Sequence, residues 1–205
     1  MEPANLLGDV TRAEFRRWLE DNHGSERECW VHARRGRPAD DSCLWYLDAV
    51  EEAICFGWID SVQKPIEGVM MQRFSPRRKG GNWSELNKER ARRLERIGLM
   101  TDAGRAALPP MGPDSFRFDP DMVERLQEAG VWERFQEFPD LYQRVRAYSL
   151  SFIKKDADAY GRMMDRLIRC TREGRTFGEW NDYGRLLRAR QPKTSLKADR
   201  FSKLP

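Results

Sequence analysis

Histidine is scarce in this chain of 205 residues, which holds only His23 and His32. A zinc or iron centre built on histidines is therefore nearly excluded, and a Ser-His-Asp triad would have to use one of these two residues. The four cysteines form no CxxC pair and show no regular spacing. We predict free, buried thiols, with no metal site and no cofactor.

Long apolar segments are also missing. No run approaches the roughly 18 consecutive apolar residues that a membrane-spanning helix needs. The first 15 residues lack the basic stretch followed by an apolar stretch that marks a signal peptide. We therefore expect a cytoplasmic protein without a membrane span.

A strong charge imbalance is absent as well. Charged residues make up 34% of the chain, yet the formal net charge is only +4. The first hundred residues carry equal numbers of basic and acidic side chains, and much of the excess lies in the tail 191–205. A nucleic-acid binder usually carries a dominant basic face, so this distribution argues against one. We predict disorder for the tail, because it is polar and lacks periodicity.

The hydrophobic pattern predicts an α+β protein with a small antiparallel sheet of about three strands, packed with helices and followed by a C-terminal helical module. The predicted strands cover 29–35, 58–64 and 69–75. A capping box at Thr11 and Glu14 starts the first helix. The helix over 46–55 is predicted to be amphipathic, with Asp48, Glu51 and Glu52 on its polar face.

Proline marks the boundary between the two parts. Four of the eleven prolines fall within 108–120, which is typical of a linker. We therefore predict an α+β domain over 1–107, a linker over 108–120, a helical module over 121–190 and a basic tail over 191–205.

The segment around the predicted helix 84–97 concentrates donors for an anion. Nine basic and three acidic residues lie between Arg73 and Arg96. Ser84 is placed to cap the helix, and helix N-termini attract anions. Polar groups interrupt the apolar face of that helix and would need partners if buried. The candidate ligand-binding residues here are Arg73, Arg77, Trp83, Ser84, Asn87 and Arg90.

A second informative segment runs from Cys55 to Asp60. Trp58 and Asp60 lie two residues apart in a predicted strand and so share a face. A carboxylate that faces an arginine-rich loop is a candidate general base, with Trp58 beside it as a binding residue. The commoner interpretation is scaffold: Asp60 would pair with Arg73 or Arg77, the tryptophans would be core residues, and Cys55 a small buried hydrophobe.

The third segment, Phe177–Arg185, is rich in aromatic, glycine and polar residues and does not resemble another bundle helix. Two interpretations have equal weight. It folds back on the core and lines a pocket, or it forms a C-terminal clasp. The secondary candidate residues are Trp180, Asn181, Asp182 and Arg185 from this segment, together with Cys55.

These segments together resemble the YdeI/OmpD-associated family. The resemblance rests on motifs that agree in order and spacing over roughly residues 12–107. They are Ala53-Ile-Cys-Phe-Gly-Trp-Ile-Asp60, Gln72-Arg-Phe-Ser-Pro-Arg77, Asn82-Trp-Ser-Glu-Leu-Asn87, Gly98-Leu-Met100 and Gly104. The resemblance implies a cytoplasmic bacterial α+β protein with a stress-response or bacteriocin-protection role, and it implies no particular reaction.

Three functional hypotheses follow. In the first, the arginine, tryptophan and aspartate residues bind a small anionic molecule without chemistry. In the second, the protein is a cofactor-independent enzyme of specialised metabolism that acts on an anionic substrate with Asp60 as base. In the third and weakest, the Arg90–Arg96 face and the tail serve a nucleic-acid accessory role. A protein partner or a homo-oligomer is compatible with each.

Overall fold

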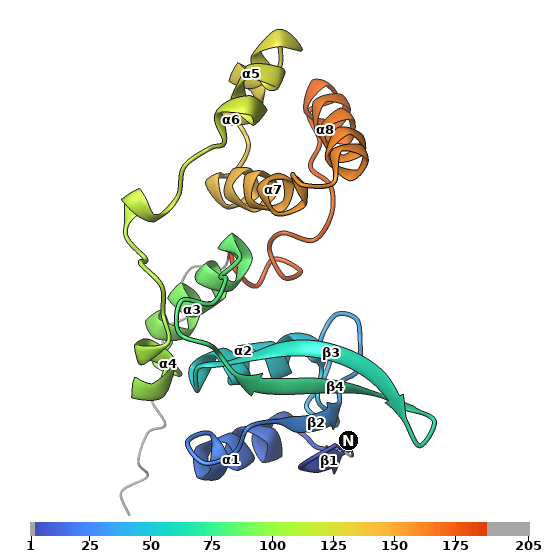
Figure 1. Ribbon diagram of the computed structural model, residues 1–205, viewed down its shortest axis with the longest axis vertical. Coiled ribbons are helices and arrows are strands. Elements are labelled where there is room, and N and C mark those ends of the chain that lie inside the picture. Colours follow the sequence, from blue (N-terminus) through green and yellow to red (C-terminus); the bar gives the residue numbers. More distant parts are fainter. Residues whose placement is uncertain (1–2, 188–205) are drawn as a thin grey trace, which may run out of the picture.

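The structure is a computed structural model that describes residues 3–187, and it confirms the predicted α+β class. It has a sheet-containing lobe and a helical lobe, with helix α3 and the C-terminal segment between them (Figure 1). Helix α1 (Arg12–Asn22) begins as predicted, because the hydroxyl of Thr11 accepts from the Glu14 amide and the Glu14 carboxylate accepts from the Thr11 amide.

The sheet differs from the predicted antiparallel set of about three strands, because it has four strands and is mixed. Its order is β1-β2-β4-β3, with β1 parallel to β2 and the other neighbours antiparallel. The strands are β1 (Leu6–Gly8), β2 (Cys29–His32), β3 (Trp58–Ile66) and β4 (Val69–Pro76). Strand β1 is three residues long, too short to show an alternating pattern in the sequence.

Helix α2 (Tyr46–Cys55) lies at the centre of the first lobe. Its apolar residues pack with α1 and the sheet in one core that includes Phe15, Ile54 and Phe74. The helix has no solvent-exposed polar face, since every residue from 47 to 55 is buried, including Asp48, Glu51 and Glu52. The sequence places these carboxylates on a polar face, but neighbouring elements cover that face and supply basic partners.

Helix α3 (Glu85–Arg96) starts at Ser84, whose hydroxyl accepts from the Asn87 amide at 3.1 Å, as the sequence predicts. Helix α4 (Asp102–Ala106) packs directly against the end of α2. A Cβ atom at Gly104 would lie 2.2 Å from the carbonyl oxygen of Cys55. Only glycine permits this approach, which gives the glycine of the last motif a packing role.

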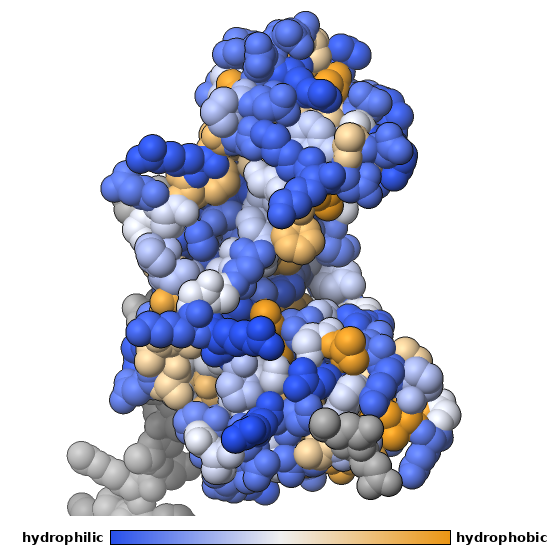
Figure 2. Space-filling model, in the orientation of Figure 1, coloured by the Kyte–Doolittle hydropathy of each residue, from blue (hydrophilic) through white to orange (hydrophobic). Residues whose placement is uncertain are grey.

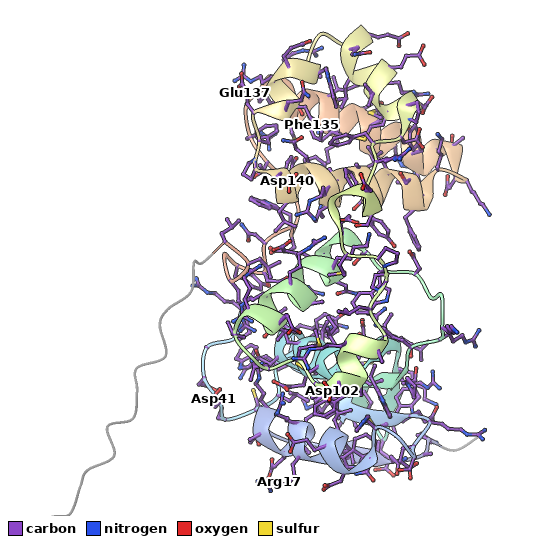
Figure 3. The ribbon with its side chains drawn as sticks, turned by 90° about the vertical axis from the view of Figure 1, so that its left-hand side faces the viewer. Arg17, Asp41, Asp102, Phe135, Glu137 and Asp140 are labelled. Atoms are coloured by element: carbon purple, nitrogen blue, oxygen red, sulfur yellow. The ribbon has the colours of Figure 1, made fainter. Side chains whose placement is uncertain are left out.

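The C-terminal lobe contains a short 3-10 helix and four α-helices around a second core. These are η1 (Pro113–Ser115), α5 (Pro120–Glu128), α6 (Trp132–Gln136), α7 (Asp140–Ile153) and α8 (Ala157–Arg172). Phe135 is fully buried and points into this lobe, while Glu137 points outward (Figure 3). The residues predicted as a linker contribute to both cores, with Leu108 in the first and Phe116 in the second.

After α8 the chain returns toward the first lobe, beside α3 (Figure 1). Leu186 packs with Leu141, Val145 and Leu86 in a small third cluster. Residues 188–190 of the predicted helical module and the predicted tail 191–205 lie outside the described residues. Hydrophilic side chains cover most of the visible face, with only small apolar patches (Figure 2). No helix among residues 3–187 is long and apolar enough to cross a membrane.

Candidate functional site

Asp60, the candidate base, lies half-buried on β3 and accepts a hydrogen bond from the hydroxyl of Tyr46 at 2.6 Å. The strand pairing is irregular between Asp60 and Gln63, and irregularities of this kind re-aim side chains. The buried amide of Gln72 donates to the backbone carbonyl oxygens there. Burial raises the pKa of Tyr46 to about 12, and the charge of Asp60 adds to the shift. Tyr46 therefore stays a hydrogen-bond donor at neutral pH.

Arg77 directly follows β4, and its backbone amide donates at 2.9 Å to the carbonyl oxygen of Gly57, just before the strand that carries Asp60. Its guanidinium lies 3.7 Å from the centre of the Trp83 ring, and its Nη1 donates to the carbonyl oxygen of Asn82 at 3.3 Å. Its Nε is buried and has no hydrogen-bond partner. Burial lowers the pKa of Arg77 to about 10, and the charge of Asp60 opposes that shift. Within the described chain Arg77 forms no ion pair.

The other two candidate arginines are neutralised. Arg73 donates from Nε to Glu28 at 2.6 Å. Arg90 makes two hydrogen bonds of 2.8 Å to the carboxylate of Asp182 and a third to the side-chain oxygen of Asn87. Burial lowers the pKa of Arg90, but the hydrogen bonds and charge of Asp182 outweigh burial, and the net shift is upward. Arg73, Asn87 and Arg90 are thus held by internal partners.

Trp58, Ser84 and Cys55 have scaffold roles in the structure. Trp58 is 1% exposed, and its indole nitrogen donates to the backbone oxygen of His23. The Ser84 hydroxyl serves as the helix cap. Burial raises the pKa of the Cys55 thiol to about 12, so Cys55 carries almost no thiolate at neutral pH and is a poor nucleophile. Trp58 is therefore a core residue, and its ring is not accessible to a ligand.

The segment around Asp182 folds back on the first lobe. It is bonded to α3 and it also lines a small cavity, so it has features of both predicted interpretations. Asp182 and Tyr183 both adopt left-handed backbone angles, with φ of 51° and 57°. The side-chain oxygen of Asn181 accepts from the Gly184 amide, and Trp180 packs edge-on against Tyr142. A small cavity of about 110 Å³ opens beside this turn. It is lined by Arg37, Pro38, Asp182, Tyr183 and Arg185.

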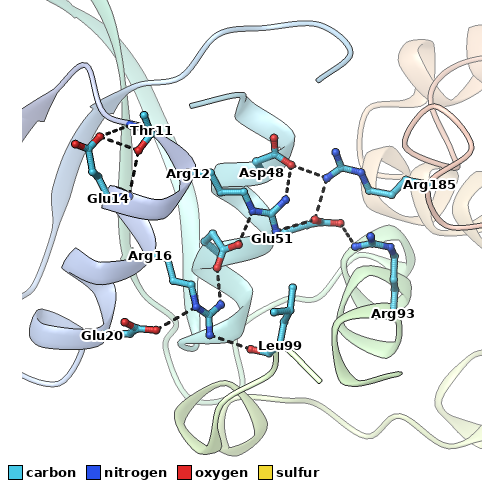
Figure 4. A network of polar contacts seen from close by, with 11 residues as sticks. Thr11, Arg12, Glu14, Arg16, Glu20, Asp48, Glu51, Arg93, Leu99 and Arg185 are labelled. Atoms are coloured by element: carbon cyan, nitrogen blue, oxygen red, sulfur yellow. Dashed lines mark hydrogen bonds and ion pairs between the residues drawn. The ribbon is translucent and has the colours of Figure 1, made fainter. Parts of the chain in front are cut away.

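The buried carboxylates of α2 form a polar network with arginines from other parts of the chain (Figure 4). Glu51 is fully buried and bonds Arg93 at 2.7 Å and Arg185 at 2.9 Å. Asp48 bonds Arg12 and Arg185, each at 2.7 Å. Arginines from α1, from α3 and from the C-terminal segment therefore converge on one helix. Three acidic residues at positions 48, 51 and 52 share a face, which was the only sequence signal for this network.

Sequence reasoning missed Tyr46 and Arg35, which complete the surroundings of Asp60. The guanidinium of Arg35 stacks on the Tyr46 ring, 3.7 Å from its centre. The same guanidinium donates to Gln63 and Gln72 at 3.2 and 3.1 Å. These residues belong to a helix start and a loop that carry no motif, so no local signal points to them.

In a comparison with known protein families, part of the chain matches a family whose role is unknown. The family model of a domain of unknown function, DUF8412, matches residues 9–107. The match contains Tyr46, Asp60 and Arg77 but ends before Asp182. No curated protein and no solved structure matches the chain. The resemblance to the YdeI/OmpD-associated family stays a prediction.

Proposed function

We propose that this protein binds a small anionic ligand at Arg77, beside the Tyr46–Asp60 pair. The observation that carries the proposal is the state of Arg77, a partly buried residue whose Nε is buried and lacks an acceptor. Removing a cation from water without a counter-charge is unfavourable, and an arriving oxyanion offsets that cost. Arg73 and Arg90 do not offer this, because their carboxylate partners are already in place.

The neighbouring groups narrow the class of ligand. Asp60 would repel a purely anionic molecule, but it would accept a hydrogen bond from a hydroxyl or amine group. The guanidinium of Arg77 lies over the Trp83 ring, and a planar guanidinium favours two-point recognition of carboxylate or phosphate. We therefore expect a ligand with one oxyanion for Arg77 and one donor group for Asp60. A stress-response or bacteriocin-protection role would act through such binding.

The test compares two adjacent arginines. Thermal unfolding of the wild-type protein, Arg77→Met and Arg78→Met is measured with phosphate, sulfate and a series of hydroxy- and amino-carboxylates. Arg78 is exposed and serves as the matched control. A ligand at about 100 times its Kd stabilises by about 2.7 kcal/mol, which raises the Tm by roughly 5–10 °C in a chain of this size. We expect that shift in the wild-type protein and Arg78→Met, and its loss in Arg77→Met.

Failure of every anion to shift the wild-type Tm would refute the proposal, and so would equal shifts in Arg77→Met. Asp60→Asn adds a second measurement. It should weaken ligands that carry a donor group more than ligands that lack one. If it weakens both equally, Asp60 does not contact the ligand.

The enzyme hypothesis remains the second candidate, because the Tyr46–Asp60 hydrogen bond positions a half-buried carboxylate whose charge acts on Arg77. Asp60 would take a proton from a substrate whose anionic group lies at Arg77. The test is Asp60→Asn once a substrate is found. The variant should fold as the wild type does and lose turnover, and unchanged turnover would remove Asp60 from the mechanism.

The nucleic-acid hypothesis receives little support from the arginine-rich face of α3. Arg90 and Arg93 are bonded to Asp182 and Glu51. Arg92 and Arg96 both pair with Glu89, at 3.1 and 3.6 Å. Few charges on this face remain available to phosphate groups, which argues against this hypothesis.

A further inference from the structure

A second basic site lies in the C-terminal lobe, away from Arg77. Helices α7 and α8 and the segment at Phe177 surround a hollow of about 370 Å³, within the usual size range of small-molecule sites. Three arginines supply its charge: Arg146, Arg162 and Arg166. Met163 and Phe177 supply apolar surface, and no carboxylate lines it among the described residues.

Arg146 is the unusual member of this set. It is only 7% exposed, although it lies in the middle of α7. Its Nη2 donates to the backbone oxygen of Glu179 at 3.2 Å, while its Nε is buried and has no partner. Within residues 3–187 neither Arg146 nor the other two arginines forms an ion pair. Burying a cation without a counter-ion is energetically unfavourable, so a bound anion would stabilise this site.

Two of the three arginines lie close to the aromatic ring of Phe177. The guanidinium of Arg146 lies 5.0 Å from the ring centre and that of Arg166 lies 4.5 Å from it. Contacts of this type favour each cation modestly. They do not remove the repulsion between the two charges: burial lowers the pKa of Arg146, and the charge of Arg166 acts in the same direction. An anion between them would offset both the burial of the Arg146 charge and its repulsion from Arg166.

The backbone at Gly178 leaves space beside the Arg146 guanidinium. Gly178 adopts a left-handed φ of 66°, and a Cβ atom there would lie 2.9 Å from Nη1 of Arg146. A larger residue would displace the guanidinium or cover it. The glycine therefore allows the chain to pass close to Arg146 while the hollow stays accessible.

We propose that this hollow binds a phosphate monoester whose organic part is apolar or aromatic. Three guanidinium groups suit a group of nearly two negative charges better than a single carboxylate, and planar arginine forks match phosphate oxygens. Met163 and Phe177 would contact the organic part. The site is separate from Arg77 in residues and in lobe, so it does not depend on the function proposed above.

Phenyl phosphate is the first probe, and its binding to the full chain is measured by titration calorimetry. Arg166→Gln is the test variant, because Arg166 is exposed and the change should not disturb folding. Arg169→Gln is the matched control, because Arg169 is exposed on the same helix and does not line the hollow. Loss of a charge-assisted hydrogen bond should weaken binding about tenfold or more in Arg166→Gln, with no change in Arg169→Gln.

Inorganic phosphate and phenol separate the two parts of the ligand. We expect phosphate to bind more weakly than phenyl phosphate, and phenol not to compete. Arg77→Met should leave phenyl phosphate binding at this hollow intact, so either proposal can fail alone. Absence of saturable binding to the wild-type protein below about 5 mM, equal weakening in Arg169→Gln, or competition by phenol would each overturn the proposal.

Discussion

Arg90 and Asp182 lie 92 positions apart in the sequence and are joined by two parallel hydrogen bonds of 2.8 Å. The pair connects α3 with the last described segment, and the side chains of both residues are largely buried. Arg185 extends the connection to Asp48 and Glu51 of α2. The C-terminal segment is therefore part of the structure around the candidate site rather than an appendage of the helical lobe.

Asp182→Asn should destabilise the protein by about 3–5 kcal/mol, because it leaves the Arg90 cation buried without a counter-charge. In a chain of this size that corresponds to a fall in Tm of roughly 6–20 °C. The measurement is thermal unfolding, with the exposed Glu179→Gln as control. The double variant Arg90→Met/Asp182→Asn should recover most of the loss, because it removes the buried cation and keeps at 182 a residue that tolerates the left-handed backbone. A fall below about 1 kcal/mol in Asp182→Asn would show that the pair does not secure the segment.

Glu51→Gln should also cost about 3–5 kcal/mol, because Glu51 is fully buried and pairs with arginines from α1, α3 and the C-terminal segment. Glu20→Gln is the matched change on the surface, since Glu20 pairs with Arg16 but is half exposed. Surface pairs contribute about 0–1 kcal/mol. Denaturant unfolding of both variants checks the contrast, and similar losses in the two would contradict the buried network.

The cysteines should differ sharply in reactivity. Burial raises the pKa of Cys55 to about 12 and raises the pKa of Cys29 as well. Cys170 is buried and Cys43 is partly exposed. A thiol reagent at pH 8 should therefore label Cys43 first, and raising the pH to 10 should not make Cys55 reactive. Mass spectrometry of native and denatured protein locates the labels, and rapid native labelling of Cys55 would contradict its scaffold role.

Local chemistry explains which parts of the fold could be predicted. The Thr11 capping box and the Ser84 cap act within a few residues, so the starts of α1 and α3 were correct. Strand β1 was missed because it is short and pairs with a strand more than twenty residues away. The polar face of α2 was misinterpreted because its arginine partners come from α1, α3 and the C-terminal segment.

The candidate site shows the same limit. Arg73, Arg77 and Arg90 look alike in the sequence, since all three lie within one basic segment. What separates them is a distant carboxylate: Glu28 for Arg73, Asp182 for Arg90, and none within the described residues for Arg77. Such partners depend on tertiary packing, so no local pattern identifies the arginine that remains available.

The partly buried charge of Arg77 gives a pH-dependent prediction. Burial lowers the folded-state pKa of Arg77 to about 10, below its ordinary value, so at neutral pH its charge opposes folding. Arg77→Met without ligand should therefore be as stable as the wild type or up to about 2 kcal/mol more stable.

As the pH rises through 10, the folded wild-type protein releases the Arg77 proton while the unfolded chain keeps it. The stability of the wild type then rises relative to Arg77→Met, and the gap between them narrows. Denaturant unfolding at pH 7 and pH 10.5 measures this gap, and groups common to both proteins cancel. A large loss of stability in Arg77→Met at pH 7 would mean that an internal partner already satisfies Arg77, and the ligand proposal would lose its basis.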